Sequence, residues 1–231
     1  RWAFPGYVYL KNIYTALERG GMLLALKNTV IISGISILLI VVVGAMAAYP
    51  IARNRNRMNN LVKGFIMGVM MIPPLSILVP LYSFMAKVQG INSYWGMIVT
   101  LLTFQLPTSI FLFSSFISSI PIALEEAAAI DGCGPFQTFF RIIMPQLKPV
   151  TASVVIITGV NCWNNYQFAL YLLQSPKIKT ITLAIAGFFS ADSANVNGAA
   201  AAAFLGILPV IVVFLFLQKY FIQGMVDSAI K

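Results

Sequence analysis

The residues that could do ionic chemistry are few, and half of the acidic ones lie in one short stretch. The chain has only six Asp and Glu residues and no His, and Glu125, Glu126 and Asp131 all fall within the sequence LEEAAAIDG. Carboxylates among small residues could pair with Arg or Lys on a partner that approaches closely. Cys133 and Cys162 have no metal-ligand companions, and the absence of His together with only six acidic residues argues against a metal site or an acid–base catalytic site. The stretch therefore predicts a docking surface.

A second group of polar side chains, NCWNNYQ, interrupts an otherwise apolar run. Amides at membrane depth are costly unless they face protein or a water-filled cavity. They suit a ligand rich in hydroxyl groups, and aromatic rings can stack on sugars. Hydrogen bonding between helices is the structural alternative. The segment has no acidic residue, which favours an uncharged ligand, and the candidate pathway residues are Asn161, Trp163, Asn164, Asn165, Tyr166 and Gln167.

The acidic stretch needs a short helix with a defined start and end. Ser118 and Ser119 are candidate N-caps, and Pro121 suits a first helical turn. The two glutamates would then lie near the positive end of the helix dipole, which stabilises them. Gly132 predicts the C-terminal end of this helix.

A second short helix is expected to begin at Pro135, a residue that fits a first turn. Four apolar residues in it share one face at the spacing i, i+3, i+4 and i+7, namely Phe136, Phe139, Phe140 and Ile143. We expect this aromatic face to pack against the chain's own membrane spans. The two short helices form an elbow, residues 118–149, between two apolar spans.

The elbow resembles the EAA loop of permease subunits of bacterial ABC importers. That loop has Glu-Ala-Ala, three residues, Gly, nine residues, Ile, one residue and Leu-Pro. Here the matching residues are Glu126, Ala127, Ala128, Gly132, Ile142, Met144 and Pro145, with Met in place of Leu. The segments ITLAIAGF and QKYFIQGMV extend the resemblance to carbohydrate permeases of the maltose type.

The resemblance implies that the elbow docks in a cleft of a separate nucleotide-binding subunit. Glu125 and Asp131 join the matched residues as expected ATPase-coupling positions. An ABC ATPase homodimer would bind ATP and Mg, and this chain would hold no cofactor. The absence of a P-loop of the form GxxxxGK[ST] from the sequence agrees with this division of labour.

The resemblance also implies a second homologous permease subunit and an extracytoplasmic solute-binding protein. The segment FFSADSANVNG corresponds to a loop that reaches toward the binding protein, and a plain connecting loop is the alternative. The candidate contacts are Phe188, Phe189, Asp192, Asn195 and Asn197.

The composition places the chain in a membrane. Hydrophobic residues make up 59% of its 231 residues, charged residues only 9%, and mean hydropathy is +0.88. A soluble domain does not have this balance. The net charge of +9 fits contact with lipid headgroups, and the scattered basic residues argue against nucleic acid as a partner.

We expect an all-α integral membrane protein in which residues 1–231 form a single polytopic bundle. The expected spans are 28–52, 64–86, 96–117, 150–173 and 199–217, with a cytoplasmic elbow over 118–149 and an external loop over 175–198. The basic sequence RNRNR at 53–57 marks the cytoplasmic side. Pro73, Pro74 and Pro80 predict that the second span is kinked and lines the interior. A further span before residue 1 would make six.

Together these features predict a multi-pass permease subunit of a binding-protein-dependent ABC importer in the bacterial cell membrane. We expect it to move an oligosaccharide or similar neutral sugar and to catalyse no reaction itself. A permease for another solute, such as an amino acid or a peptide, is the alternative within the class. A secondary transporter would need Asp, Glu or His in its spans for ion coupling, and the expected spans have none.

Overall fold

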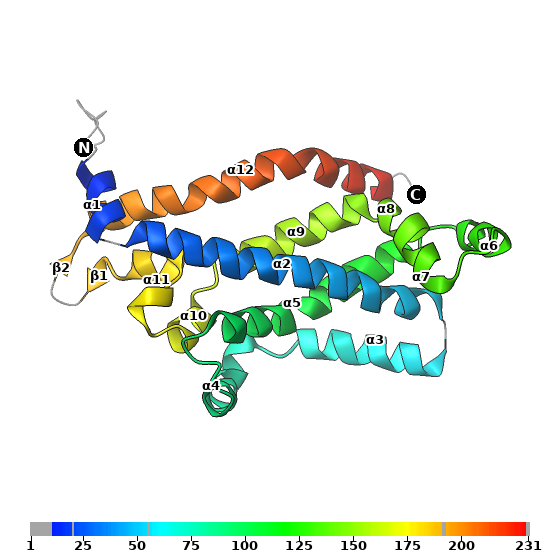
Figure 1. Ribbon diagram of the computed structural model, residues 1–231, viewed down its shortest axis with the longest axis horizontal. Coiled ribbons are helices and arrows are strands. Elements are labelled where there is room, and N and C mark those ends of the chain that lie inside the picture. The colour runs from blue at the N-terminus through cyan, green and yellow to red at the C-terminus, as the bar shows by residue number, and fades with distance from the viewer. Residues whose placement is uncertain (1–10, 20, 55, 191–192, 230–231) are drawn as a thin grey trace.

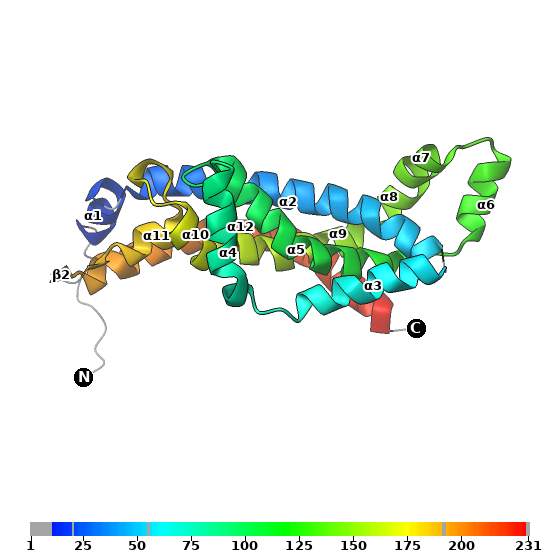
Figure 2. The same ribbon diagram turned by 90° about the horizontal axis from the view of Figure 1, so that it is seen from below.

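The protein is an elongated helical bundle (Figures 1 and 2). The computed structural model describes residues 11–19, 21–54, 56–190 and 193–229. Within these ranges, three helices are long and apolar enough to cross a membrane, and two bent helix pairs raise the possible number of spans to five. The three long helices are α2 (Met22–Arg53), α5 (Tyr94–Ile117) and α12 (Val196–Ala229).

Shorter elements connect the long helices. Before α5 they are α1 (Lys11–Arg19), α3 (Arg57–Met70), η1 (Pro74–Ile77) and α4 (Leu78–Lys87). After α5 come α6 (Ala123–Ile130), α7 (Pro135–Thr138), the π-helix η2 (Phe139–Ile143), α8 (Met144–Gln146), α9 (Lys148–Trp163), α10 (Gln167–Leu172), η3 (Pro176–Ile178) and α11 (Ile181–Ala186). Two short antiparallel strands, β1 (Phe189–Ser190) and β2 (Ser193–Ala194), precede α12. The predicted helical membrane fold is confirmed, with this hairpin as an addition.

The connecting elements divide between the two ends of the bundle. α6 and α7 project beyond the long helices at one end, whereas α1, α11 and the hairpin lie at the other (Figure 1). α12 begins beside the hairpin and runs toward the end that carries the elbow. The elbow and the loop before α12 are therefore separated by the length of the bundle.

Helices α2 and α5 pack closely because small residues face each other where they meet. A Cβ atom added to Gly44 would lie 2.1 Å from Oγ of Ser109, so a larger residue requires a shift. The Ser109 hydroxyl donates to the Ile40 carbonyl across the contact at 3.0 Å. In a membrane the hydrophobic effect does not drive helices together, because the lipid is as apolar as their side chains. Close packing of small residues and interhelical hydrogen bonds hold them together instead. α9 packs against both helices of this pair, and α12 packs against α9.

The expected kinked span over residues 64–86 is a pair of separate helices. α3 ends at Met70, and the chain turns by 90° on the way to α4. Pro73 and Pro74 lie at the turn, where each lacks the N–H that would continue a helix. None of the residues of α3 is buried within the described chain, so α3 does not line the interior of this chain's own bundle. Figure 2 shows α4 crossing the direction of the long helices.

The expected span over 150–173 is also interrupted. α9 ends at Trp163, and α10 is a separate helix that begins at Gln167. The backbone N–H of Asn164 donates to the Val160 carbonyl at 3.0 Å, so the interruption begins as an ordinary helix C-terminus. The amide-rich segment predicted from the sequence therefore lies at a break between helices and not inside a continuous one.

The hydrophobic core joins the spans to the second arm of the elbow. One cluster contains five residues without exposed surface, namely Phe113 and Ile117 of α5, Ile143 of η2, Leu147 between α8 and α9, and Val154 of α9. In α6, by contrast, Ala128 is the one buried residue. The second arm is thus anchored by packing, whereas α6 lies largely outside the core.

Candidate coupling site and translocation pathway

The start of α6 differs from the expectation. Ser118 and Ser119 do not cap it, since their hydroxyls donate back to backbone carbonyls of α5, each at 2.8 Å. These bonds close the C-terminal turn of α5. α6 begins at Ala123 without a side-chain cap, and Pro121 precedes the helix instead of entering its first turn. Both glutamates nevertheless lie in the first turn, as predicted.

Gly132 ends α6, as the sequence predicts. Its φ angle is +80°, in the left-handed region that favours glycine. The N–H of Gly132 donates to the Ala129 carbonyl at 3.1 Å, and the N–H of Cys133 donates to the Ala128 carbonyl at 2.9 Å. These are the two bonds of a glycine-terminated helix end. No atom lies within 4 Å of the position of an added Cβ, so backbone conformation and not space requires glycine here.

The aromatic face of the second arm is divided between core and surface. Phe139 and Ile143 are 4% and 0% exposed, whereas Phe136 and Phe140 are 74% and 49% exposed. The π-helix η2 has a wider turn than an α-helix, so it rotates the residues on either side of it relative to one another. The prediction that all four residues pack against the spans is correct for two and wrong for the other two.

The outward surface of the elbow combines acidic, small and apolar side chains. The exposed coupling candidates are Glu126, Ala127, Asp131, Gly132 and Pro145. Ile130 and Phe136 add apolar side chains that are 87% and 74% exposed. Among the described residues, no group of three His, Cys, Asp or Glu side chains could hold a metal ion. The arrangement suits contact with another protein, because exposed aliphatic and aromatic side chains of this kind mark interaction surfaces.

The remaining coupling candidates are less accessible. Ala128 is 4% exposed, and Ile142 and Met144 are half-buried. Met144 packs against the hydrophobic core, where it replaces the usual Leu. These three residues pack inside the elbow and contribute little to its exposed surface.

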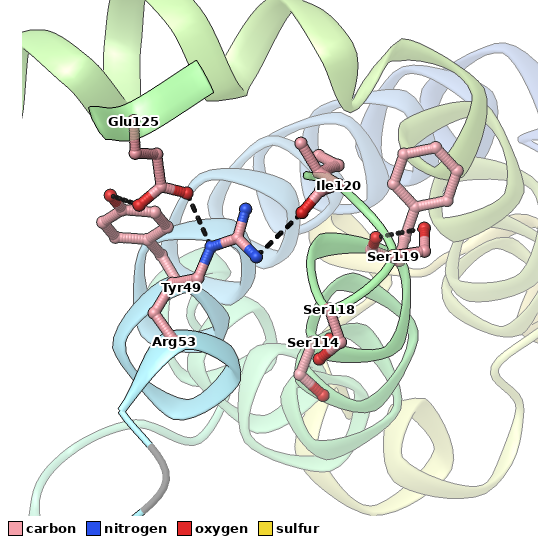
Figure 3. A network of polar contacts seen from close by, with 8 residues as sticks. Tyr49, Arg53, Ser114, Ser118, Ser119, Ile120 and Glu125 are labelled. Atoms are coloured by element: carbon pink, nitrogen blue, oxygen red, sulfur yellow. Dashed lines mark hydrogen bonds and ion pairs between the residues drawn. The ribbon is translucent and has the colours of Figure 1, made fainter. Parts of the chain in front are cut away.

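Glu125 is turned toward its own chain (Figure 3). Its Oε1 accepts a hydrogen bond from Nε of Arg53 at 2.6 Å, and its Oε2 accepts one from the Tyr49 hydroxyl at 2.8 Å. Nη1 of Arg53 also donates to the Ile120 carbonyl at 3.0 Å. The side chains of the ion pair are only 13% and 15% exposed. The interpretation of Glu125 as a partner for basic residues of another subunit is therefore wrong in this structure.

Four of the six predicted pathway residues are exposed near the break between α9 and α10. They are Asn161, Asn164, Tyr166 and Gln167. Nδ2 of Asn161 donates to Oε1 of Gln105 on α5 at 3.3 Å, so a second helix contributes an amide to the same place. Polar side chains at membrane depth that do not face the core of their own chain must face water or another protein.

The other two predicted pathway residues are engaged within the chain. Nε1 of Trp163 donates to the Gly206 carbonyl of α12 at 3.1 Å, and its ring borders an apolar cavity of about 430 Å³ between α2, α9 and α12. Oδ1 of Asn165 accepts the N–H of Phe168 at 3.1 Å and so starts α10. Both side chains thus hold helices in place, and their assignment to the pathway stays a prediction.

The loop before α12 places two of its predicted contact residues at the surface. Phe189 is 57% exposed and Asn197 is exposed. Phe188 is half-buried, and Asn195 is exposed but uses Oδ1 to accept the N–H of Gly198 at 2.8 Å. Asp192 lies outside the described residues. Among the described residues before and at the start of α12, Phe189 and Asn197 therefore remain available for contact with another protein.

Comparison with known proteins settles the family. Residues 40–227 match the family described as "Binding-protein-dependent transport system inner membrane component". The chain belongs to this family. It is therefore a multi-pass cell-membrane protein and a permease subunit of a transport system.

The permease is similar over its whole length to sugar permeases. It is 43% identical to the melibiose/raffinose/stachyose import permease protein MelC of Bacillus subtilis (strain 168), covering 100% of this chain and 84% of that protein. It is 32% identical to the multiple sugar-binding transport system permease protein MsmG of Streptococcus mutans, with the same coverage of both chains. The resemblance of this chain to carbohydrate permeases is thereby confirmed.

A solved structure shows the same fold. The permease superposes on a chain of a bacterial ABC transporter involved in the import of the acidic polysaccharide alginate with a TM-score of 0.81. The match covers 94% of this chain and 81% of that chain at 19% identity. The overall fold of the permease thus has a solved counterpart.

Sequence reasoning missed three residues of the permease that the structure places at its sites. Tyr49 and Arg53 hold Glu125, and Gln105 contacts Asn161. Tyr49 and Arg53 are four positions apart at the end of a span, a spacing that puts both on one helix face. Their partner lies 72 positions beyond Arg53, and no local pattern in the sequence signals such a pairing.

Proposed function

We propose that this permease imports a neutral oligosaccharide, with melibiose, raffinose and stachyose as the first candidates. The relative with 43% identity is named for these sugars, and others are named for arabinooligosaccharides and starch degradation products. These names favour a sugar over the alternative of an amino acid or a peptide. The proposal rests first on the elbow, which gives the permease a surface that a separate ATPase could bind.

The exposed amides near the α9–α10 break support a hydroxyl-rich, uncharged solute. Asn161, Asn164, Gln167 and Gln105 offer both donors and acceptors, which suits sugar hydroxyl groups. Tyr166, 41% exposed, adds an aromatic surface beside them. A charged solute would call for a charged partner, and this cluster has none.

An ABC ATPase homodimer is the partner that the elbow would engage. The elbow extends past the ends of the spans (Figure 2), and its exposed residues include the apolar Ile130 and Phe136 and the acidic Glu126 and Asp131. Small side chains at Ala127 and Gly132 allow a partner to approach the backbone. ATP and Mg would be bound by that partner, and this chain would hold no cofactor.

A second homologous permease would cover α3 and α4. Apolar residues on this face are highly exposed, among them Phe65 at 73% and Met71 at 84%. The helix break between Met70 and Pro74 leaves backbone groups without a helical partner, and such a break is tolerated at membrane depth only against protein or water. A protein neighbour fits this face better than lipid.

An extracytoplasmic solute-binding protein would deliver the sugar at the opposite end, where Phe189 and Asn197 are exposed. ATP binding would draw the ATPase subunits together, displace the elbow and move the spans between inward-open and outward-open states. The second arm of the elbow is continuous with the core through Phe139 and Ile143, so its displacement reaches α5 and α9.

Reconstitution of the whole transporter tests the proposal. Proteoliposomes that contain this permease, its partner permease, the ATPase and the binding protein are expected to accumulate radiolabelled raffinose only with ATP at the ATPase side. An excess of unlabelled melibiose should compete, whereas an excess of an amino acid should not. Accumulation of an amino acid or a peptide, without accumulation of any oligosaccharide, would contradict the assignment.

A further inference from the structure

Resting on the proposed function, we infer that Tyr49, Arg53 and Glu125 form a clamp that fixes α6 to the end of α2. In this assignment, Glu125 is a positioning residue that does not contact the ATPase. The clamp carries displacement of the elbow into α2, the span that packs along α5. Glu126, the next residue, keeps its place on the docking surface.

The geometry of the clamp uses both oxygens of one carboxylate. Tyr49 and Arg53 lie one helical turn apart at the end of α2, so their side chains reach the same side. Arg53 binds Oε1 and the Tyr49 hydroxyl binds Oε2, at 2.6 and 2.8 Å (Figure 3). Because two separate donors hold the two oxygens, α6 cannot rotate about its axis without breaking one of these bonds.

Arg53 also ties the clamp to the segment between α5 and α6. Its Nη1 donates to the Ile120 carbonyl at 3.0 Å, three residues before α6 begins. Tyr49 reaches the second arm as well, because its ring centroid lies 5.2 Å from that of Phe139. One turn of α2 therefore contacts the α5–α6 connection, α6 and η2.

The clamp matters because little else attaches α6. Ala128 is the one buried residue of this helix, and its neighbours are exposed or half-buried. The ion pair is shielded from water, with its side chains 13% and 15% exposed, so it is stronger than a pair at the surface. Removing one partner leaves the other charge poorly solvated, which makes the loss costly.

The clamp assigns a second role to the basic sequence at residues 53–57. If the cluster only set the orientation of the protein in the membrane, the number of basic residues would matter and each of them would be equivalent. Arg53 instead has defined bonds, whereas Arg57 is exposed at the start of α3. This contrast within one cluster supplies a matched control.

The test measures sugar transported per ATP hydrolysed, together with the amount of ATPase that co-purifies with the permease. Glu125→Gln and Arg53→Gln in the complete reconstituted transporter are expected to retain the ATPase but to lower the transport ratio about five-fold or more. Arg57→Gln should match wild type in both measurements. Tyr49→Phe should lower the ratio less, and adding it to Glu125→Gln should cause no further loss, because both changes break the same clamp.

Exchanging the charges of Arg53 and Glu125 distinguishes loss of the ion pair from a general disruption of the fold. Arg53→Glu combined with Glu125→Arg is expected to recover part of the ratio that either single change removes. Wild-type ratios in both Glu125→Gln and Arg53→Gln would overturn the clamp, as would loss of the ATPase from Glu125→Gln, which would make Glu125 a docking residue.

Gly132→Asp in the same experiment distinguishes the clamp from the proposed function. If Gly132→Asp abolishes uptake while the clamp variants transport normally, the clamp alone is wrong. If Gly132→Asp also transports normally, the coupling role of the elbow is wrong as well.

Discussion

Gly132 ends α6 in a backbone conformation that other residues adopt only at a cost. With φ at +80°, a side chain there costs about 1–2 kcal/mol, although there is room for a Cβ. We expect Gly132→Val to reduce sugar uptake strongly and Gly132→Asn to reduce it least, since Asn tolerates left-handed conformations. Uptake by cells that express each variant at matched levels measures this order.

Gly134 provides the control for this substitution. It lies two residues away at φ −74°, and its Cβ position is also open. Gly134→Ala should therefore transport at the wild-type rate. Equal losses from Gly132→Asn, Gly132→Val and Gly134→Ala would show that the elbow tolerates no change at all, and the conformational explanation would fail.

The amide of Asn161 is expected to act on the solute. Asn161→Leu keeps a side chain of similar size but removes the donor that reaches Gln105, so a sugar in the pathway loses hydrogen bonds. We expect the KM for sugar uptake or the maximal rate to worsen by about ten-fold, the size of one or two such bonds. Ile157→Leu, one turn earlier on an exposed position of α9, is the control and should behave as wild type. Unchanged uptake by Asn161→Leu would remove this residue from the pathway.

At the scale of elements, the contact of α2 with α5 should govern stability. Gly44→Ala places a methyl group 2.1 Å from Oγ of Ser109, which must move and give up its bond to Ile40. The expected cost is about 1–3 kcal/mol. A lower midpoint of thermal unfolding in detergent would register it.

Gly34→Ala in the same helix is the comparison. No atom lies within 4 Å of its Cβ position, and Ala favours a helix over Gly. Its unfolding temperature should equal or exceed that of wild type. If both variants unfold at the wild-type temperature, close packing at Gly44 does not limit stability.

The elements also show which features a sequence can predict. Features that depend on residues close together in the sequence were predictable. They are the helical fold, the end of α6 near Gly132 and the start of α7 at Pro135. The π-helix η2 was not predictable, because no residue pattern signals an extra residue in a turn. Phe136 and Phe140, which the periodicity placed on the same face as Phe139 and Ile143, are exposed.

Contacts between distant segments were also beyond prediction. The number of basic residues after α2 indicated the side of the membrane, but gave no sign that Arg53 binds Glu125. Likewise, the amides near Asn161 were recognised as polar, whereas the roles of Trp163 and Asn165 depend on α12 and α10. In each case the deciding partner comes from another helix.

At the scale of the whole molecule, the elbow and the hairpin lie at opposite ends of the bundle (Figure 1). Arg53, in the basic cluster, contacts Glu125 of the elbow, so both markers of the cytoplasmic side agree. In a Cys133→Ser background, Ile130→Cys should react with a membrane-impermeant maleimide only in inside-out vesicles. Phe189→Cys should react only in right-side-out vesicles or intact spheroplasts.

Labelling of both sites from the same side would contradict this arrangement. Cys162, the other native thiol, is 4% exposed and should contribute little background. Both introduced cysteines replace highly exposed side chains, at 87% and 57%, so failure to react from one side reports on the membrane and not on burial.

The central claim is that the elbow binds a separate ATPase, which drives the movement of the spans. Co-purification of the ATPase with the permease tests this claim most directly. We expect wild type and Phe189→Asp to retain the ATPase, and Ile130→Asp combined with Phe136→Asp to lose it by about ten-fold or more, because charges would replace exposed apolar contacts. Equal retention of the ATPase by all three proteins would contradict the account.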